Sequence, residues 1–159
     1  MTDSDSAQGG GRSGADQERF YVQGDKHHIF QAWGKDDETA ALPTLKDAFV
    51  FAAAVGYANG RRVPFAGRRQ HVGFWRAFTA QEDVPLFQAL AIAETGDPAV
   101  VADTGRILAI VEQYANGGID IMDTYRRGDR DATVVALAAL VSEAGDARPI
   151  VVARSLDQS

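Results

Sequence analysis

Apolar residues recur along most of the chain with the spacing of helices, and the clearest segment runs from Thr44 to Asn59. After its first turn almost every position is apolar, which predicts a central, buried helix. Thr44 is a good N-cap, and Asn59 with the following Gly60 is a stop signal. Gly56 lies inside this helix, where glycine lowers helix propensity by about 1 kcal/mol relative to alanine. We therefore expect another helix to approach it closely.

Capping residues, apolar spacing and glycine stops mark the other helices. They predict helices over His27–Trp33, Asp83–Gly96, Asp97–Asn116, Gly118–Gly128 and Asp131–Gly145. Asp83 and Asp131 are the expected N-caps of two of these helices, and Asn116 with Gly117 is expected to end a third. The predicted fold class is mainly α, a compact helical domain of about five helices.

Two short segments have the composition of strands. Phe20–Val22 and Ile150–Ala153 are rich in β-branched and aromatic residues, and we expect them to pair as a minor β element. The segment Arg61–Arg76 has no clear period and contains proline and glycine, so we expect a long connection with short extended pieces.

Length and composition indicate one domain, because 159 residues with 45% hydrophobic content suffice for a single core. Residues 1–18 are rich in Gly, Ser, Asp and Gln and are expected to form a disordered tail. Residues 19–154 form the predicted helical domain, and 155–159 form a C-terminal tail. No apolar run approaches the roughly 20 residues that span a bilayer, and cysteine is absent. We expect a soluble cytoplasmic protein that does not contact membranes.

Charge changes this picture at one place. The net charge of -6 and the pI of about 5.0 disfavour a protein that coats nucleic acid. The connection from residue 61 to residue 76 nevertheless holds five arginines and a histidine, interleaved with aromatic residues and free of acids. This composition suits contact with a phosphate backbone and stacking on bases. The predicted DNA-binding residues are Arg61, Arg62, Arg68, Arg69, His71 and Arg76; the alternative is that these arginines pair with carboxylates of the same domain.

Other patterns give weaker evidence for a metal or catalytic site. Asp120 and Asp123, with Glu112 upstream, could bind a divalent cation, because residues three apart share a helix face. A solvated acidic face explains them equally, and no nuclease spacing follows. The adjacent His27 and His28 point about 100 degrees apart and do not form a metal site. No nucleophile elbow or phosphate loop is visible. We predict no catalytic residue, metal ligand or cofactor.

Three stretches, Lys46–Pro64, Ala91–Asp97 and Glu112–Ile119, occur in an order that resembles the small DNA phosphorothioation-associated family known as dnd system-associated protein 4. The resemblance implies a gene neighbourhood that replaces a non-bridging phosphate oxygen of DNA with sulfur and restricts unmodified invading DNA, as in antiviral defence. It implies partners in that system and transfers no catalytic residues.

Our leading hypothesis is a non-enzymatic accessory protein of a phosphorothioation-linked modification and restriction system, contacting DNA or a DNA-bound complex through the Arg-rich segment. The alternative is an adaptor whose amphipathic face, Ile107 to Tyr114, docks a larger nuclease or ATPase of the same system. A third hypothesis is a metal-dependent nuclease using Asp120 and Asp123. Arginines that converge on one exposed face favour DNA contact, whereas arginines dispersed into separate ion pairs favour the adaptor. The oligomeric state is left open.

Overall fold

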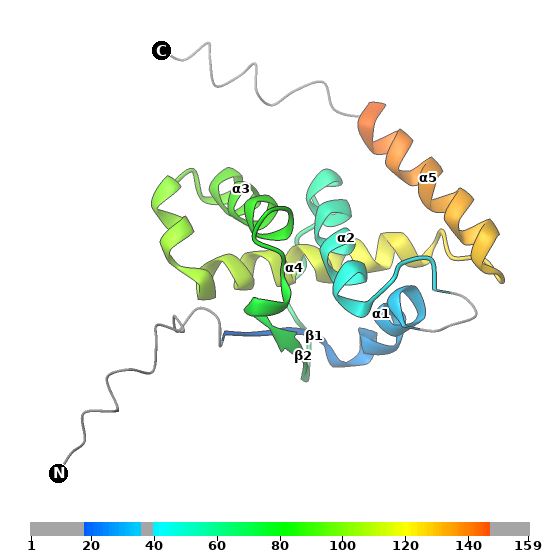
Figure 1. Cartoon of the computed structure of the whole chain (residues 1–159), viewed down its shortest axis with the longest axis horizontal. Coiled ribbons are helices and arrows are strands. Elements are labelled where there is room, and N and C mark those ends of the chain that lie inside the picture. Colours follow the sequence, from blue (N-terminus) through cyan, green and yellow to red (C-terminus); the bar gives the residue numbers. More distant parts are fainter. Residues whose placement is uncertain (1–17, 36–39, 147–159) are drawn as a thin grey trace.

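The structure is a computed structural model that describes residues 18–35 and 40–146 (Figure 1). Its elements in chain order are β1 (Arg19–Gln23), α1 (His27–Gly34), α2 (Leu45–Ala58), β2 (Arg69–Phe74), α3 (Asp83–Thr95), α4 (Thr104–Asp123) and α5 (Arg130–Asp146). Single 3-10 turns lie at Gly24–Lys26 and Trp75–Ala77, and a longer one lies at Pro98–Ala102. The mainly-α prediction is confirmed.

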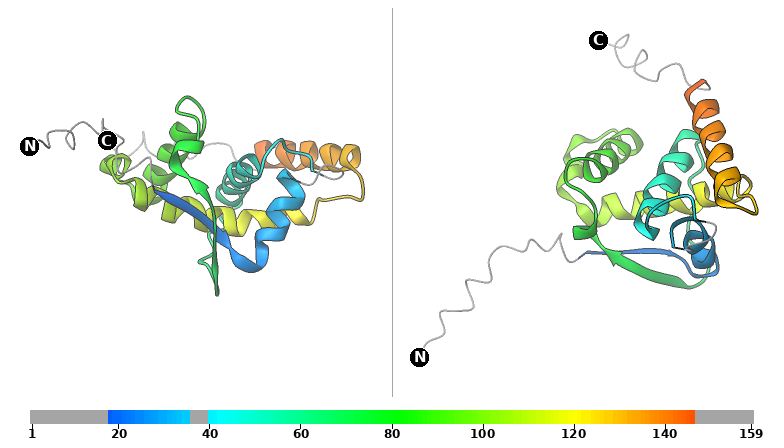
Figure 2. Two further views of the ribbon diagram at one scale, coloured as in Figure 1. Left: turned by 60° about the horizontal axis from the view of Figure 1, so that its bottom comes forward. Right: turned by 45° about the vertical axis from the view of Figure 1, so that its right-hand side comes forward.

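Helix α4 runs through the middle of the molecule, α2 crosses it, and the β1–β2 sheet lies along one side (Figure 2). The crossing of α2 and α4 is the most extensive contact between elements. A Cβ placed on Gly56 would lie 2.0 Å from the carbonyl oxygen of Tyr114, and one on Gly118 would lie 1.7 Å from that of Ala52. The predicted close approach at Gly56 is confirmed, because no side chain fits between the two backbones.

Helix α4 does not end at Asn116 and Gly117 as predicted; it continues through both glycines to Asp123. The separate helix predicted from Gly118 is therefore the last part of α4. A Cβ on Gly117 would lie 2.2 Å from the carbonyl oxygen of Arg61. The Asn-Gly-Gly sequence is thus a packing surface for α2 and for the coil that follows it.

The core is aromatic where β1, α2 and α3 meet. The ring of Phe49 in α2 lies 4.8 Å from that of Phe20 in β1, and Phe78 lies 4.8 Å from Phe87 in α3. All four side chains are buried. The amphipathic face predicted to dock a partner, Ile107 to Tyr114, belongs to this interior, because its large apolar side chains are buried too: Ile107, Leu108, Ile110, Val111 and Tyr114. The adaptor cannot use that face.

Strand β1 is confirmed, and β2 is its antiparallel partner within the part of the chain that the structure describes. The connection 61–76 therefore does contain an extended piece. Its predicted partner Ile150–Ala153 lies outside the described residues, as do the predicted tails apart from Glu18. None of the described helices is long and apolar enough to cross a membrane.

Two predicted helix caps are wrong by one or two residues. Asp83 is the first residue of α3 rather than its N-cap, and its carboxylate accepts from Lys46 Nζ at 3.0 Å and from the backbone N–H of Thr79 at 2.9 Å. At α5 the cap is Asp129, whose carboxylate accepts from the N–H of Ala132 at 2.8 Å. At α5 two neighbouring acids, Asp129 and Asp131, are alternatives for the cap, and spacing alone does not choose between them. At α3 the N-cap position is Glu82, whose side chain makes no capping bond.

Candidate nucleic-acid interface

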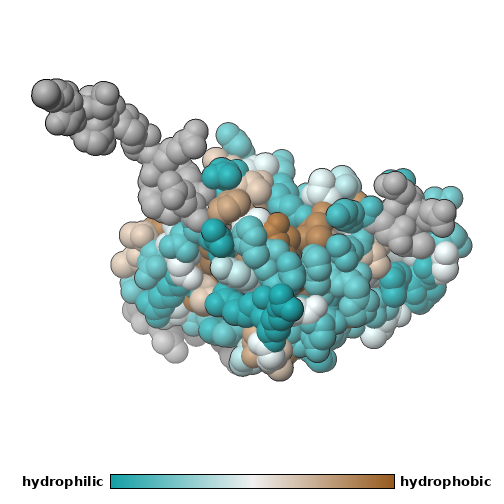
Figure 3. Space-filling model, turned by 90° about the horizontal axis from the view of Figure 1, so that it is seen from below, coloured by the Kyte–Doolittle hydropathy of each residue, from teal (hydrophilic) through white to brown (hydrophobic). Residues whose placement is uncertain are grey.

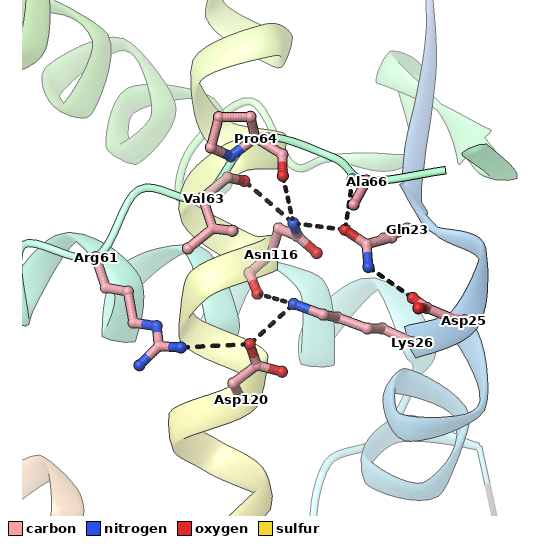
Figure 4. Close-up of polar contacts among 9 residues, drawn as sticks. All are labelled: Gln23, Asp25, Lys26, Arg61, Val63, Pro64, Ala66, Asn116 and Asp120. Atoms are coloured by element: carbon pink, nitrogen blue, oxygen red, sulfur yellow. Dashed lines mark hydrogen bonds and ion pairs between the residues drawn. The ribbon is translucent and has the colours of Figure 1, made fainter. Parts of the chain in front are cut away.

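A buried amide holds the coil between α2 and β2 against α4 (Figure 4). Asn116 Nδ2 donates towards the carbonyl oxygens of Val63 at 3.1 Å and Pro64 at 3.3 Å, and towards Gln23 Oε1 at 3.1 Å. The same Gln23 oxygen accepts from the N–H of Ala66 at 2.8 Å. Because Asn116 and Gln23 are buried, these bonds fix where the coil leaves the helix pair and where β2 begins.

Arg61, the first residue of the coil with a predicted DNA contact, faces α4 instead. Its Nη2 atom lies 3.6 Å from Asp120 Oδ2, and Lys26 Nζ lies 2.8 Å from the same oxygen (Figure 4). Lys26 Nζ also donates to the carbonyl oxygen of Asn116 at 3.0 Å. The Asp120 carboxylate is therefore neutralised by two cations of the protein.

Arg62 is engaged on the neighbouring side of α4. Its Nε donates to Gln113 Oε1 at 2.6 Å, and its Nη1 lies 2.5 Å from Glu94 Oε1 on α3. The hydroxyl of Tyr114 donates to the other Glu94 oxygen. The hydrogen bond from Tyr114, and to a smaller extent the one from Arg62, holds the pKa of Glu94 below its usual value. Arg62 thus ties the coil to α3 and α4.

The remaining predicted residues gather at the sheet. In the β1–β2 register Arg19 lies opposite Phe74, Tyr21 opposite His71, and Gln23 opposite Arg69, so one face carries all of them. An irregularity beside Phe20 and Tyr21 brings His71 and Phe74 to this side, whereas Phe20 and Val22 point into the core. We call this surface the outer sheet face: it comprises Arg19, Tyr21, Arg69, His71, Phe74 and Arg76, and the exposed Arg68, which directly precedes β2, borders it.

Cations stack on aromatic rings across the outer sheet face. The guanidinium of Arg69 lies 4.2 Å from the ring centroid of Tyr21, and that of Arg76 lies 4.5 Å from Phe74. The guanidinium of Arg19 lies 5.7 Å from the same Phe74 centroid. Among the described residues, Arg19, Arg68 and Arg76 form no ion pair. Viewed from below, this side of the molecule is mostly hydrophilic (Figure 3).

One buried carboxylate lies behind the face. Glu112 of α4 accepts from the backbone N–H of Tyr21 at 2.6 Å through Oε2, and from Arg69 Nη2 at 3.3 Å through Oε1. Burial raises the pKa of Glu112 to about 7, although both contacts favour the charged form. The Arg69 side chain is 54% exposed and that of Glu112 only 7%, so the pair joins the surface to the interior.

A cavity of about 210 Å³ opens beside this pair. It is lined by Phe65, Arg69, Ala109, Glu112 and Gln113. The coil supplies one wall and α4 the other. From the sequence, Glu112 was considered only together with Asp120 and Asp123, because a sequence does not show that a charged helix residue faces the interior.

The six predicted contacts thus divide. Arg69, His71 and Arg76 lie on the outer sheet face with Arg68 at its border, whereas Arg61 and Arg62 pair with the helix acids Asp120 and Glu94. Arg69 also pairs with a helix acid, Glu112, behind the face. Arg19 and Tyr21 belong to the face and were missed. Their alternation with buried Phe20 and Val22 could have indicated a half-exposed strand, but its pairing with β2 was not visible.

The acids proposed for a metal do not converge. Asp120 meets Lys26 and Arg61, and Asp123 lies 3.2 Å from Arg126 Nε. Across residues 18–35 and 40–146, no group of three histidine or acidic side chains could hold a metal ion. The described geometry therefore gives the nuclease hypothesis no support.

Residues 19–154 match the family described as DNA sulphur modification system-associated protein 4. No curated protein and no solved structure matches the chain. The matched range includes every element described above, the two strands among them.

Proposed function

The chain belongs to the DNA sulphur modification system-associated protein 4 family, and we propose that it serves that system as a non-enzymatic accessory protein that contacts DNA, or a DNA-bound complex, through its outer sheet face. Its place of action is the cytoplasm, and its role lies in the modification and restriction that act against invading DNA. The observation that carries the proposal is the stacking of Arg69 and Arg76 on exposed-side aromatic rings, with no carboxylate paired to Arg68 or Arg76 among the described residues.

Stacked guanidinium groups suit this role for a physical reason. A ring beneath a guanidinium holds its plane and leaves the N–H edge free to donate to phosphate oxygens. The aromatic rings of Tyr21 and Phe74 can in turn stack on bases. Because the whole chain carries a charge of -6, attraction must act at short range and involve few phosphates.

The proposal narrows the predicted contact set. Arg61 and Arg62 pair with Asp120 and Glu94 on the helices, so we assign them to holding the coil. Arg69 is also paired, with Glu112, but its side chain is 54% exposed and stacks on Tyr21 at the outer sheet face, so we retain it as a contact. The proposed contacts are Arg19, Arg68, Arg69, His71 and Arg76. Four arginines at four phosphates would give a slope of about -3.6 in a plot of log affinity against log salt concentration.

The test is a titration of duplex and single-stranded DNA at several salt concentrations. The double variant Arg68→Glu/Arg76→Glu should lose at least roughly tenfold in affinity and show a shallower salt slope, because two phosphate contacts become repulsive. The control Arg127→Glu/Arg130→Glu makes the same change in net charge on exposed residues at the start of α5 and just before it. Equal losses in both variants, or none in either, would remove the outer sheet face as the contact.

A second candidate function is an adaptor for another protein of the system, and α5 favours it. Val134, Val135 and Val141 are 44%, 70% and 52% exposed, while Leu137 and Leu140 of the same helix are buried. Apolar side chains on both sides of one surface helix are typical of an interaction site. If α5 docks a protein of the system, Val135→Asp/Val141→Asp should abolish its co-purification and leave DNA binding unchanged.

A further inference from the structure

Phosphate contacts at the outer sheet face would leave the cavity beside Glu112 without a role. Its volume of about 210 Å³ lies below the range of drug-sized ligand sites. It opens between Phe65 of the coil and Ala109 of α4, where the small alanine side chain leaves room. A ligand of this size is a small group, such as one ring system.

The charges that line the cavity select against ions. A cationic ligand would meet the guanidinium of Arg69, and an anionic ligand would meet the carboxylate of Glu112. A neutral group that offers both donors and acceptors avoids either conflict. Phe65 adds an apolar wall, and Arg69 already lies 5.7 Å from its ring centroid.

Hydrogen-bonding capacity remains at the cavity wall. Each Glu112 oxygen accepts one bond from the protein, so each keeps a second lone pair. Arg69 spends one N–H on Glu112 and has others available, since a guanidinium carries five. The Oε1 atom of Gln113 is bound by Arg62, which leaves its amide N–H groups as donors.

We propose that this cavity binds a single unstacked nucleobase that carries an exocyclic amino group, with Glu112 accepting from the amino group, Arg69 donating to the neighbouring ring acceptor and Phe65 stacking. The inference rests on the proposed function, because the outer sheet face must hold the strand whose base enters. Cytosine offers an amino donor where thymine offers a carbonyl oxygen, which a carboxylate repels. In this proposal the cavity distinguishes one base from another, and the outer sheet face binds the phosphate backbone.

The experiment measures the affinity of three single strands of equal length: all cytosine, all thymine and abasic. It is performed at about pH 8, where Glu112 with a pKa of about 7 is mostly ionised. The cytosine strand should bind roughly tenfold more tightly than the thymine strand, and the abasic strand should bind most weakly but in a salt-dependent way. Glu112→Gln replaces one acceptor by a donor and should abolish or reverse the preference for cytosine over thymine.

A second variant addresses the cavity without touching its charges. Ala109→Leu should fill the space and reduce cytosine binding to the abasic level, whereas Ala93→Leu, an equal change at an exposed position of α3, should leave it unchanged. Equal affinity for cytosine and thymine strands, or a preference that survives both Glu112→Gln and Ala109→Leu, overturns the base pocket and leaves the proposed function standing. Failure to bind any strand, the abasic one included, contradicts the proposed function itself.

Discussion

Glu112 shows most clearly how one residue links the interior to the surface. A buried carboxylate is unfavourable unless its oxygens are bonded, and here the N–H of Tyr21 and the guanidinium of Arg69 supply those bonds. They do not fully offset burial, which raises the pKa of Glu112 to about 7. Arg69 is therefore available both to this carboxylate and to a phosphate outside. Protonation of Glu112 weakens its ion pair with Arg69.

The raised pKa predicts how stability depends on pH. Between about 4.5 and about 7 the folded protein holds a proton on Glu112 that the unfolded chain has released. Stability contributed by this residue is thus present below pH 4.5 and is lost as pH rises through 7, by roughly 3 kcal/mol in total. Urea unfolding of the wild type and of Glu112→Gln from pH 5 to pH 8 should show the variant gaining relative stability with increasing pH. A constant difference between the two proteins across that range would contradict the raised pKa.

At residue level, the sequence revealed composition but not partners. The arginine-rich run between residues 61 and 76 was recognised, and three of its predicted contacts, Arg69, His71 and Arg76, lie on one face of the sheet. The ion pairs of Arg61 and Arg62 could not be read from the sequence, because Asp120 and Glu94, far along the chain, reach them only after α3 and α4 have packed. Tyr21 was missed for the same reason, because its cross-strand partner lies about 50 positions later.

At the scale of elements, the crossing of α2 over α4 determines the rest. Glycines at 56 and 118 bring the backbones into contact, and Gly117 admits the coil that leads to the outer sheet face. Thr44 capping and the apolar run made α2 predictable, and Gly56 correctly signalled a close approach. The end predicted for α4 at Asn116 was wrong because local stop signals were outweighed by packing: in this helix the glycines fit a neighbour, and Asn116 bonds to the coil.

This crossing gives a prediction about stability. Gly118→Ala should destabilise the fold by about 3 kcal/mol or more, because the new methyl group would overlap the carbonyl oxygen of Ala52. Gly105→Ala in the same helix has no atom nearer than 3.7 Å to the new Cβ, and should be neutral or stabilising by up to about 1 kcal/mol. Thermal unfolding of both variants provides the comparison. Similar effects at the two glycines would mean that α2 and α4 do not touch at Gly118.

At the scale of the whole molecule, an acidic protein presents one cationic, aromatic surface. The five arginines between residues 61 and 76 fall into two groups. Arg61 and Arg62 hold the coil. Arg69 and Arg76 lie with Arg19 on the outer sheet face, and Arg68 borders it. The exposed valines of α5 lie on a different element and are free to serve a protein partner at the same time. The proposed division, with DNA at the sheet and a protein partner at α5, fits an accessory subunit of a larger system.

The most direct measurement of the central claim is ultraviolet cross-linking of bound DNA, followed by mass spectrometry of the attached peptides. Aromatic residues at the contact should carry the nucleotides, so we predict attachment within residues 19–23 and 65–76, above all at Tyr21, Phe65 and Phe74. Arg68→Glu/Arg76→Glu should remove these cross-links together with binding. Attachment confined to α5 or to the α3–α4 surface around Tyr114, with residues 19–23 and 65–76 unmodified, would contradict DNA contact through the outer sheet face.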